Sequence, residues 1–206
     1  REGTVILYTE EDAEQPVTVP SVVGLTPTQA NQVLTNAGLN IRITGGEITV
    51  SAEGLGAAIG GYAGVDCGNI TIQGNVIKSV ISSGAGACIG GASNRSAGSI
   101  TISNAKLPPL NGTSLIGWIR GNTAGSLTIR NCYIEATDTA AGSGIQVSDN
   151  GNIRIENSEV KLPEKRDIRA GDGGSIVIRD STIHSNGIYR LGNLNEAKNL
   201  KRLEIT

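Results

Sequence analysis

The chain has 206 residues and a formal net charge of -2, and only 2% of its residues are aromatic. The balanced charge and low aromatic content argue against a nucleic-acid-binding surface. The apolar runs are too short for a membrane-spanning helix, and 3 cysteines make neither a disulfide framework nor a metal cluster. The length suffices for one domain with a sizeable core, alone or with a small appendage.

The first 44 residues differ from the rest and are expected to form a separate N-terminal segment. Thr26–Gln29 (TPTQ) predicts the start of a helix. Its first threonine is a suitable N-cap, proline fits the first helical position, and the glutamine completes a capping box. Gly38 is expected to end this helix, and Asn40–Ile43 is typical of a strand.

Two stretches of this segment carry a motif, namely Val17–Thr26 (VTVPSVVGLT) and Leu34–Ile41 (LTNAGLNI). They resemble the start of a PASTA domain, a module of penicillin-binding proteins and bacterial Ser/Thr kinases. The resemblance covers the first strand, the helix and the second strand, and it implies a cell-wall setting with peptidoglycan as the nearest ligand. An alternative, compatible with the first, is that residues 1–44 form an α/β cap over the end of a repeat domain.

From residue 45 to residue 206 a short pattern recurs, in which a small polar or glycine pair precedes apolar-x-apolar. The copies are Gly46–Val50, Gly68–Ile72, Gly98–Ile102, Gly125–Ile129, Gly151–Ile155, Gly174–Ile178 and the shorter Leu203–Ile205. A period of roughly 20–50 residues predicts a solenoid, a propeller or an array of repeats.

Each copy continues in the same way. A residue that tolerates left-handed backbone follows the strand: Gly74, Asn104, Asn131, Asn157 and Asp180. A second apolar position comes next: Ile77, Leu107, Ile134, Val160 and Ile183. A third apolar position completes the repeat: Ile59, Ile89, Ile116, Ile145, Ile168 and Ile188.

Three short strands per repeat, separated by bends rather than helices, predict an all-β fold: a parallel β-helix of about seven coils. A right-handed winding is expected by analogy with known β-helices of similar coil length. The repeats resemble the Gly-rich right-handed β-helix repeats of bacterial surface and secreted proteins, and more distantly the pectate-lyase-like β-helices. This resemblance implies a fold more than a function.

Strand alternation predicts which side chains are buried. Ile70 and Ile72 should point inward and stack on the equivalent isoleucines of the next coil. Thr49, Thr71, Thr101 and Thr128 should form an outward row, which suits half-exposed strand positions. The three cysteines (Cys67, Cys88 and Cys132) are predicted to be small buried thiols, with a disulfide between neighbouring coils as the alternative. His184 should point to solvent.

Five residues are candidate binding residues: Arg130, Arg154, Glu156, Arg179 and Asp180. Three of them occupy equivalent outward positions after their strands, and Arg154 lies on the same face. Such a row is usually a surface ion-pair ladder. The alternative is an anionic-glycan site, since β-helix polysaccharide lyases use Arg or Lys as a base together with acidic groups or Ca²⁺; Asp172 would then be a further candidate. Four aromatic residues (Tyr62, Trp118, Tyr133 and Tyr189) are not brought together by the repeat register.

The sequence therefore favours a non-catalytic extracellular module on a bacterial surface or cell wall, which displays structure or binds peptidoglycan or another polysaccharide. The first alternative is a β-helix polysaccharide lyase or glycoside hydrolase. The second is a fibre or spike element that self-associates through its coil ends. No cofactor, metal, nucleic acid or membrane insertion is expected.

Overall fold

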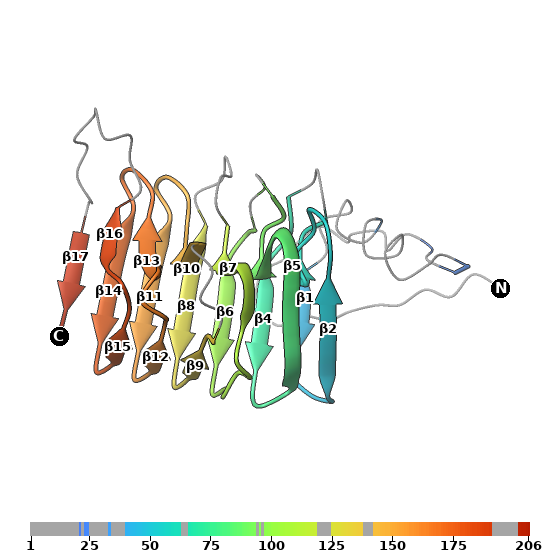
Figure 1. Cartoon of the computed structure of the whole chain (residues 1–206), viewed down its shortest axis with the longest axis horizontal. Helices are drawn as coiled ribbons and strands as arrows, with labels where there is room; N and C mark the ends of the chain where they lie inside the picture. Colours follow the sequence, from blue (N-terminus) through green and yellow to red (C-terminus); the bar gives the residue numbers. More distant parts are fainter. Residues whose placement is uncertain are drawn as a thin grey trace, which may run out of the picture.

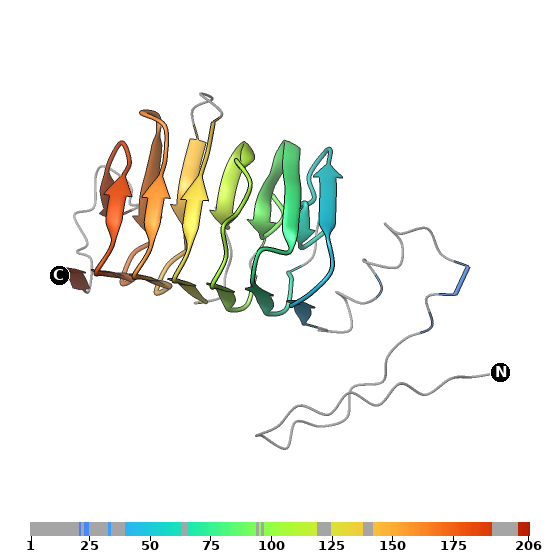
Figure 2. The same ribbon diagram turned by 90° about the horizontal axis from the view of Figure 1, so that it is seen from below.

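The computed structural model describes residues 21, 23–24, 33, 40–62, 66–93, 95, 97–118, 125–137, 142–190 and 202–206. From residue 40 onward these residues wind into a parallel β-helix, and the windings follow one another along the long axis from β1 to β17 (Figure 1). Three sheets run along this axis, and a perpendicular view shows the same stack (Figure 2). The predicted all-β parallel β-helix is confirmed.

The first sheet has seven strands in the order β1-β4-β6-β8-β11-β14-β17. Their bounds are β1 (Ile41–Ile43), β4 (Ile70–Gln73), β6 (Ile100–Ser103), β8 (Ser126–Arg130), β11 (Asn152–Glu156), β14 (Ser175–Arg179) and β17 (Arg202–Ile205). Their inward side chains pair residue for residue, so that Ile70 lies beside Ile100, which lies beside Leu127. These three side chains are 0% exposed, so the predicted apolar column is confirmed.

The second sheet is less regular, with the order β16-β13-β10-β7-β5-β2 and with β3 pairing with β5. Its strands are β2 (Ile48–Ala52), β3 (Ile59–Gly60), β5 (Ile77–Gly90), β7 (Asn111–Gly117), β10 (Gly142–Gln146), β13 (Arg166–Ala170) and β16 (Ile188–Arg190). Register shifts interrupt three of its pairings. The third apolar position of every repeat nevertheless aligns as predicted, as in the pairs of Ile116 with Ile89 and with Ile145.

The third sheet contains β9 (Tyr133–Glu135), β12 (Glu159–Lys161) and β15 (Thr182–His184). Val160 pairs with Ile134 on one side and with Ile183 on the other, which confirms the second apolar position in these windings. An isolated bridge between Lys106 and Tyr133 extends the same alignment to the preceding winding. His184 is exposed, as predicted.

Left-handed backbone at the bends after the first sheet is confirmed at all five predicted positions. Gly74 has a φ of 81°, and the four non-glycine residues have φ values of 52°, 54°, 44° and 49° at Asn104, Asn131, Asn157 and Asp180. Asparagine and aspartate adopt this conformation more readily than other side chains, because their short polar groups bond locally. The chain therefore turns at the same place in each winding.

The first repeat copy was assigned to the wrong sheet. Ile41–Ile43 is the strand that pairs with β4, whereas Ile48 pairs with Ile77 in the second sheet. Thr49 consequently lies beside Ser79 and outside the threonine row, in which Thr101 lies between Thr71 and Thr128. The expected match failed because Gly46–Val50 has the same apolar-x-apolar pattern as the true first-sheet strands.

The predictions for residues before 40, including the helix from Thr26, the cap and the PASTA-like motif, lie almost entirely outside the described residues. The division of the chain into residues 1–44 and 45–206 stays a prediction. The structure does place Ile41–Ile43, taken from the end of the first part, in the first sheet of the β-helix.

Close backbone contact holds the second sheet together where Gly60, Gly90 and Gly117 stack. All three have positive φ, at 145°, 141° and 109°. A Cβ on Gly90 would overlap the carbonyl oxygen of Gly117, and a Cβ on Gly117 would overlap that of Gln146. Only glycine combines this conformation with this approach.

A buried arginine, which the sequence analysis did not identify, ties three windings together. Arg166 is 0% exposed. Its Nη1 donates to the carbonyl oxygens of Thr113 and Ser143 at 2.9 and 3.1 Å, and its Nη2 donates to that of Gly112. The neighbouring Asp167, also buried, forms an ion pair with Arg169. These bonds join the winding of Arg166 to the two windings before it.

Candidate functional site: the asparagine groove

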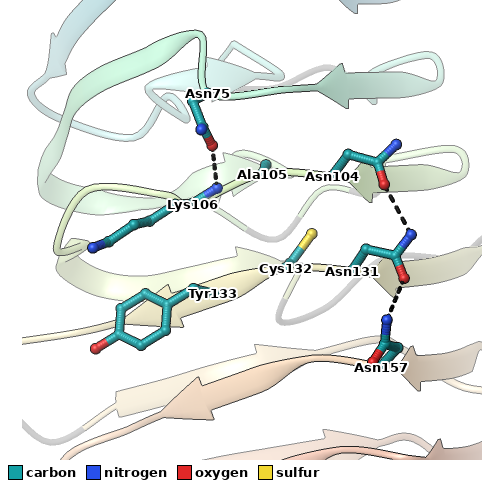
Figure 3. A pocket seen from close by; sticks show the side chains of 8 residues that line it. All are labelled: Asn75, Asn104, Ala105, Lys106, Asn131, Cys132, Tyr133 and Asn157. Atoms are coloured by element: carbon teal, nitrogen blue, oxygen red, sulfur yellow. Dashed lines mark hydrogen bonds between the residues drawn. The ribbon is translucent and has the colours of Figure 1, made fainter.

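A shallow groove of about 540 Å³ lies where the chain bends from the first sheet into the third. We call it the asparagine groove; its lining residues are Asn75, Asn104, Ala105, Lys106, Asn131, Cys132, Tyr133 and Asn157 (Figure 3). Asn104, Asn131 and Asn157 line one side, Lys106 and Tyr133 line the other, and Ala105 and Cys132 lie between them (Figure 3). The repeat fold places Asn104, Asn131 and Asn157 in register, because each is the bend residue of its winding.

Three of the asparagines form a ladder along the helix axis. The Asn131 amide donates to Asn104 Oδ1 at 2.8 Å, and the Asn157 amide donates to Asn131 Oδ1 at 2.9 Å (Figure 3). Each amide has two N–H donors and an oxygen with two lone pairs, so the ladder uses only part of the capacity of the central amide. The ladder therefore presents donors and acceptors at the spacing of neighbouring strands, about 4.8 Å.

Tyr133 lies between two lysines from neighbouring windings. The Nζ atoms of Lys106 and Lys161 lie 5.2 and 5.1 Å from the centre of its ring, within the range of cation–π attraction. The Tyr133 hydroxyl donates to Glu135 at 3.0 Å. Lys161 also forms an ion pair with Glu159 at 2.7 Å. Hydrogen bonds from Lys161 to Glu159 and Tyr133 raise the pKa of its ammonium.

Cys132 gives the groove an unreactive floor. The residue is 6% exposed, and its thiol donates to the carbonyl oxygen of Arg130 at 3.1 Å. Burial raises its pKa, and burial likewise raises the pKa of Cys67 to about 11. Both thiols are therefore protonated near neutral pH, and a protonated thiol is a poor nucleophile. All three cysteines are buried and free, as predicted, and the alternative of a disulfide is not formed.

Four of the five predicted charged residues, Arg130, Arg154, Glu156 and Arg179, lie together on the outward face of the first sheet, beside the groove. Glu156 pairs in register with Arg130 and Arg179, as expected. Arg154 forms an ion pair with Glu156, and Arg179 forms one with Glu204, which the sequence analysis had not included. The predicted row of Arg130, Glu156 and Arg179 is therefore in register, but among the described residues its members are not ion-paired with one another.

The electrostatics of this face bear on the lyase alternative. The hydrogen bond from Arg154 is the main reason why the pKa of Glu156 is lowered, and the same bond raises the pKa of Arg154. A general base must lose its proton near the working pH, whereas this pair holds Arg154 in its protonated form. The arrangement suits charge stabilisation better than proton abstraction.

The other candidates are spread more widely. Asp180 is exposed at the bend after β14, and its backbone N–H donates to the carbonyl oxygen of Thr206 at 2.9 Å. Asp172 precedes β14. Its backbone N–H donates to Asp149 Oδ1, in the turn of the preceding winding, at 2.8 Å. The whole length of β14 separates these two aspartates, so the structure does not bring the proposed catalytic set together.

The described aromatic side chains are also dispersed, as predicted. Trp118 is 1% exposed, and its indole N–H donates to Ser148 Oγ at 2.8 Å, so it belongs to the core. Tyr62 is 38% exposed near the N-terminal end. Tyr133 alone lines the asparagine groove, and the side chain of Tyr189 lies outside the described residues.

Sequence reasoning identified the three ladder asparagines only as bend residues. Their recurrence at one position in consecutive repeats was the available signal for a row of amides. The pairing of Lys106 with Tyr133 had no such signal, because that part of the repeat varies in length and composition.

Among the described residues, no group of three or more His, Cys, Asp or Glu side chains is arranged to hold a metal ion. A search of the same residues finds no helix with the length and hydrophobicity needed to cross a membrane.

Comparison with known proteins agrees with this architecture. The family described as the right handed beta helix region matches residues 117–201, a stretch that includes β8 to β16. This match and the stacked parallel sheets support the same fold, a right-handed parallel β-helix. No curated protein and no solved structure matches the chain. The resemblance of residues 1–43 to a PASTA domain stays a prediction.

Proposed function

We propose that this chain is a non-catalytic, extracellular module of a bacterial surface that binds polysaccharide along the asparagine groove. The ladder of Asn104, Asn131 and Asn157 carries the proposal, because it offers repeated hydrogen-bonding groups at a solvent-facing corner. An extended glycan has hydroxyl groups along its length that both donate and accept. A groove that is open along the helix axis suits a chain-like ligand better than a small enclosed one.

The charged face supports a binding function over a catalytic one. Arg154 and Arg179 are each engaged with a glutamate, and Asp172 and Asp180 lie at opposite ends of β14. An active site would need a nucleophile or base and a stabilising group within reach of one reacting atom.

A binding assay with matched variants tests the proposal. Asn104→Gly together with Asn131→Gly removes two ladder amides and keeps residues that accept positive φ. The control is Asn150→Gly, an exposed bend asparagine with a φ of 57° at another corner. Peptidoglycan and a panel of neutral and acidic polysaccharides are incubated with each protein, and bound protein and released product are both measured.

We expect the unaltered protein and the Asn150→Gly variant to bind at least one polysaccharide equally well. The double variant should bind about thirtyfold more weakly, since two hydrogen bonds that contribute about 1 kcal/mol each are lost. Binding that the double variant retains in full would overturn the proposal. Product release that disappears in an Arg154→Ala plus Arg179→Ala variant would replace it with the enzyme alternative.

A further inference from the structure

Two cations flank the asparagine groove, and among the described residues they have no carboxylate partner. Lys106 lines the third-sheet side of the groove, and Arg130 is the last residue of β8, directly before Asn131. Both side chains are exposed. Within the part of the chain that the structure describes, neither forms an ion pair.

The cations farther along the same two faces differ in this respect. Arg154 is paired with Glu156, Lys161 with Glu159, and Arg179 with Glu204. These pairs begin in the winding after Arg130, so Lys106 and Arg130 are left to attract an anion beside Asn104 and Asn131.

Two acidic groups near the groove limit where an anion would bind. Glu135 accepts a hydrogen bond from the Tyr133 hydroxyl, at the outer end of the ring. Asp180 occupies the bend position one winding beyond Asn157. An acidic ligand would therefore avoid the Asp180 end of the asparagine row and bind between Lys106 and Arg130.

We propose that Lys106 and Arg130 make the groove selective for polysaccharides that carry acidic groups, an inference that rests on the glycan-binding function proposed above. The asparagine amides bond to hydroxyl groups of the polymer, while the ammonium and the guanidinium attract its carboxylate, sulfate or phosphate groups from either side of the row. Lys106 contributes a mobile point charge, whereas the planar guanidinium of Arg130 offers paired donors to an oxyanion.

The test uses two matched pairs of polymers. Polygalacturonate is compared with its fully methyl-esterified form, and dextran sulfate with unmodified dextran, so that backbone and charge are varied separately. The variant is Lys106→Gln with Arg130→Gln. The control is Arg95→Gln with Lys165→Gln, which removes the same charge from two exposed positions away from the groove. Dissociation constants are measured at low and at physiological salt.

We expect tighter binding of the acidic member of at least one pair, and the pair that responds identifies the acidic group. The groove variant should lose about three- to tenfold of that affinity, the range for two exposed charge contacts. The control should lose less, and added salt should shrink the preference because screening weakens exposed charges.

Two outcomes would overturn the inference, and they are distinguishable. In the first, acidic and neutral polymers bind equally well, and the groove variant binds them as the unaltered protein does. If that binding is lost with Asn104→Gly and Asn131→Gly, the glycan-binding function stands but the charge selectivity does not. Binding of none of the four polymers or of the wider panel would remove both the selectivity and the function on which it rests.

Discussion

The first and second sheets both stack successive windings, but different interactions stabilise the stacking in each. In the first sheet, pairing follows one register from β4 to β14, and isoleucine and leucine side chains form its buried column. In the second sheet, register shifts accompany glycines in backbone contact and a buried arginine. The first sheet is stabilised mainly by buried side chains, and the second depends also on backbone geometry and buried hydrogen bonds.

This difference indicates which positions of the repeat tolerate amino-acid substitution. An apolar column accepts any branched side chain of suitable volume, as the leucine at position 127 among isoleucines illustrates. A glycine without space for a Cβ, or an arginine that satisfies several carbonyls, has no such substitute. Substitutions that act on one sheet and spare the other can test this contrast.

The largest effect is expected at the buried arginine of the second sheet. Arg166→Met should lower the free energy of unfolding by about 3–5 kcal/mol, because the carbonyl oxygens of Gly112, Thr113 and Ser143 lose the buried guanidinium that donates to them. Urea unfolding followed by circular dichroism measures the change. Lys165→Met, at the exposed neighbouring residue, should stay within about 0.5 kcal/mol. Equal stabilities of the two variants would mean that Arg166 does not tie the windings together.

A smaller loss of stability is expected at the glycines, where two substitutions distinguish steric overlap from backbone strain. Gly90→Ala should cost about 3 kcal/mol, since it combines left-handed strain with overpacking against Gly117. Gly74 also has positive φ, yet a Cβ there would meet nothing within 4 Å. Gly74→Ala should therefore cost only about 1–2 kcal/mol. Thermal or urea unfolding of both variants makes the comparison, and similar losses would show that close stacking of the second sheet adds nothing.

The smallest effect concerns the outward face of the first sheet. Arg154→Gln should raise the pKa of Glu156 toward its ordinary value, because the hydrogen bond from Arg154 is the main cause of the lowered pKa. NMR titration of the glutamate carboxyl carbons reports this directly. Arg130→Gln should shift the same pKa less, since Arg130 acts on Glu156 only through its charge.

The sign of the pH dependence follows from the direction of this shift. Because the pKa of Glu156 is lower in the folded protein, its stabilising contribution is present above the unfolded pKa of about 4.3. That contribution is lost as the pH falls through the folded value. In Arg154→Gln the stabilities at neutral and acidic pH should lie closer together. An unchanged Glu156 pKa in this variant would show that the ion pair does not form in solution.

Part of the asparagine groove could be predicted from the sequence. Asn104, Asn131 and Asn157 were predicted as bends from their residue type alone, and their φ values agree. The equivalent positions of Arg130, Glu156 and Arg179 also followed from the repeat. The partner of Arg179, the lysines around Tyr133 and the burial of Trp118 did not, because each depends on how neighbouring windings approach each other in three dimensions.

The sequence by itself determined the winding, since periodic apolar residues must be buried and left-handed bends favour glycine, asparagine and aspartate. Only the tertiary structure decided that Ile41–Ile43, rather than Gly46–Val50, joins the first sheet. It alone decided that Arg166 is buried and that Lys106 reaches Tyr133. A repeat pattern specifies which residues face inward, whereas register, bulges and contacts across windings depend on the packing of segments about 25 residues apart.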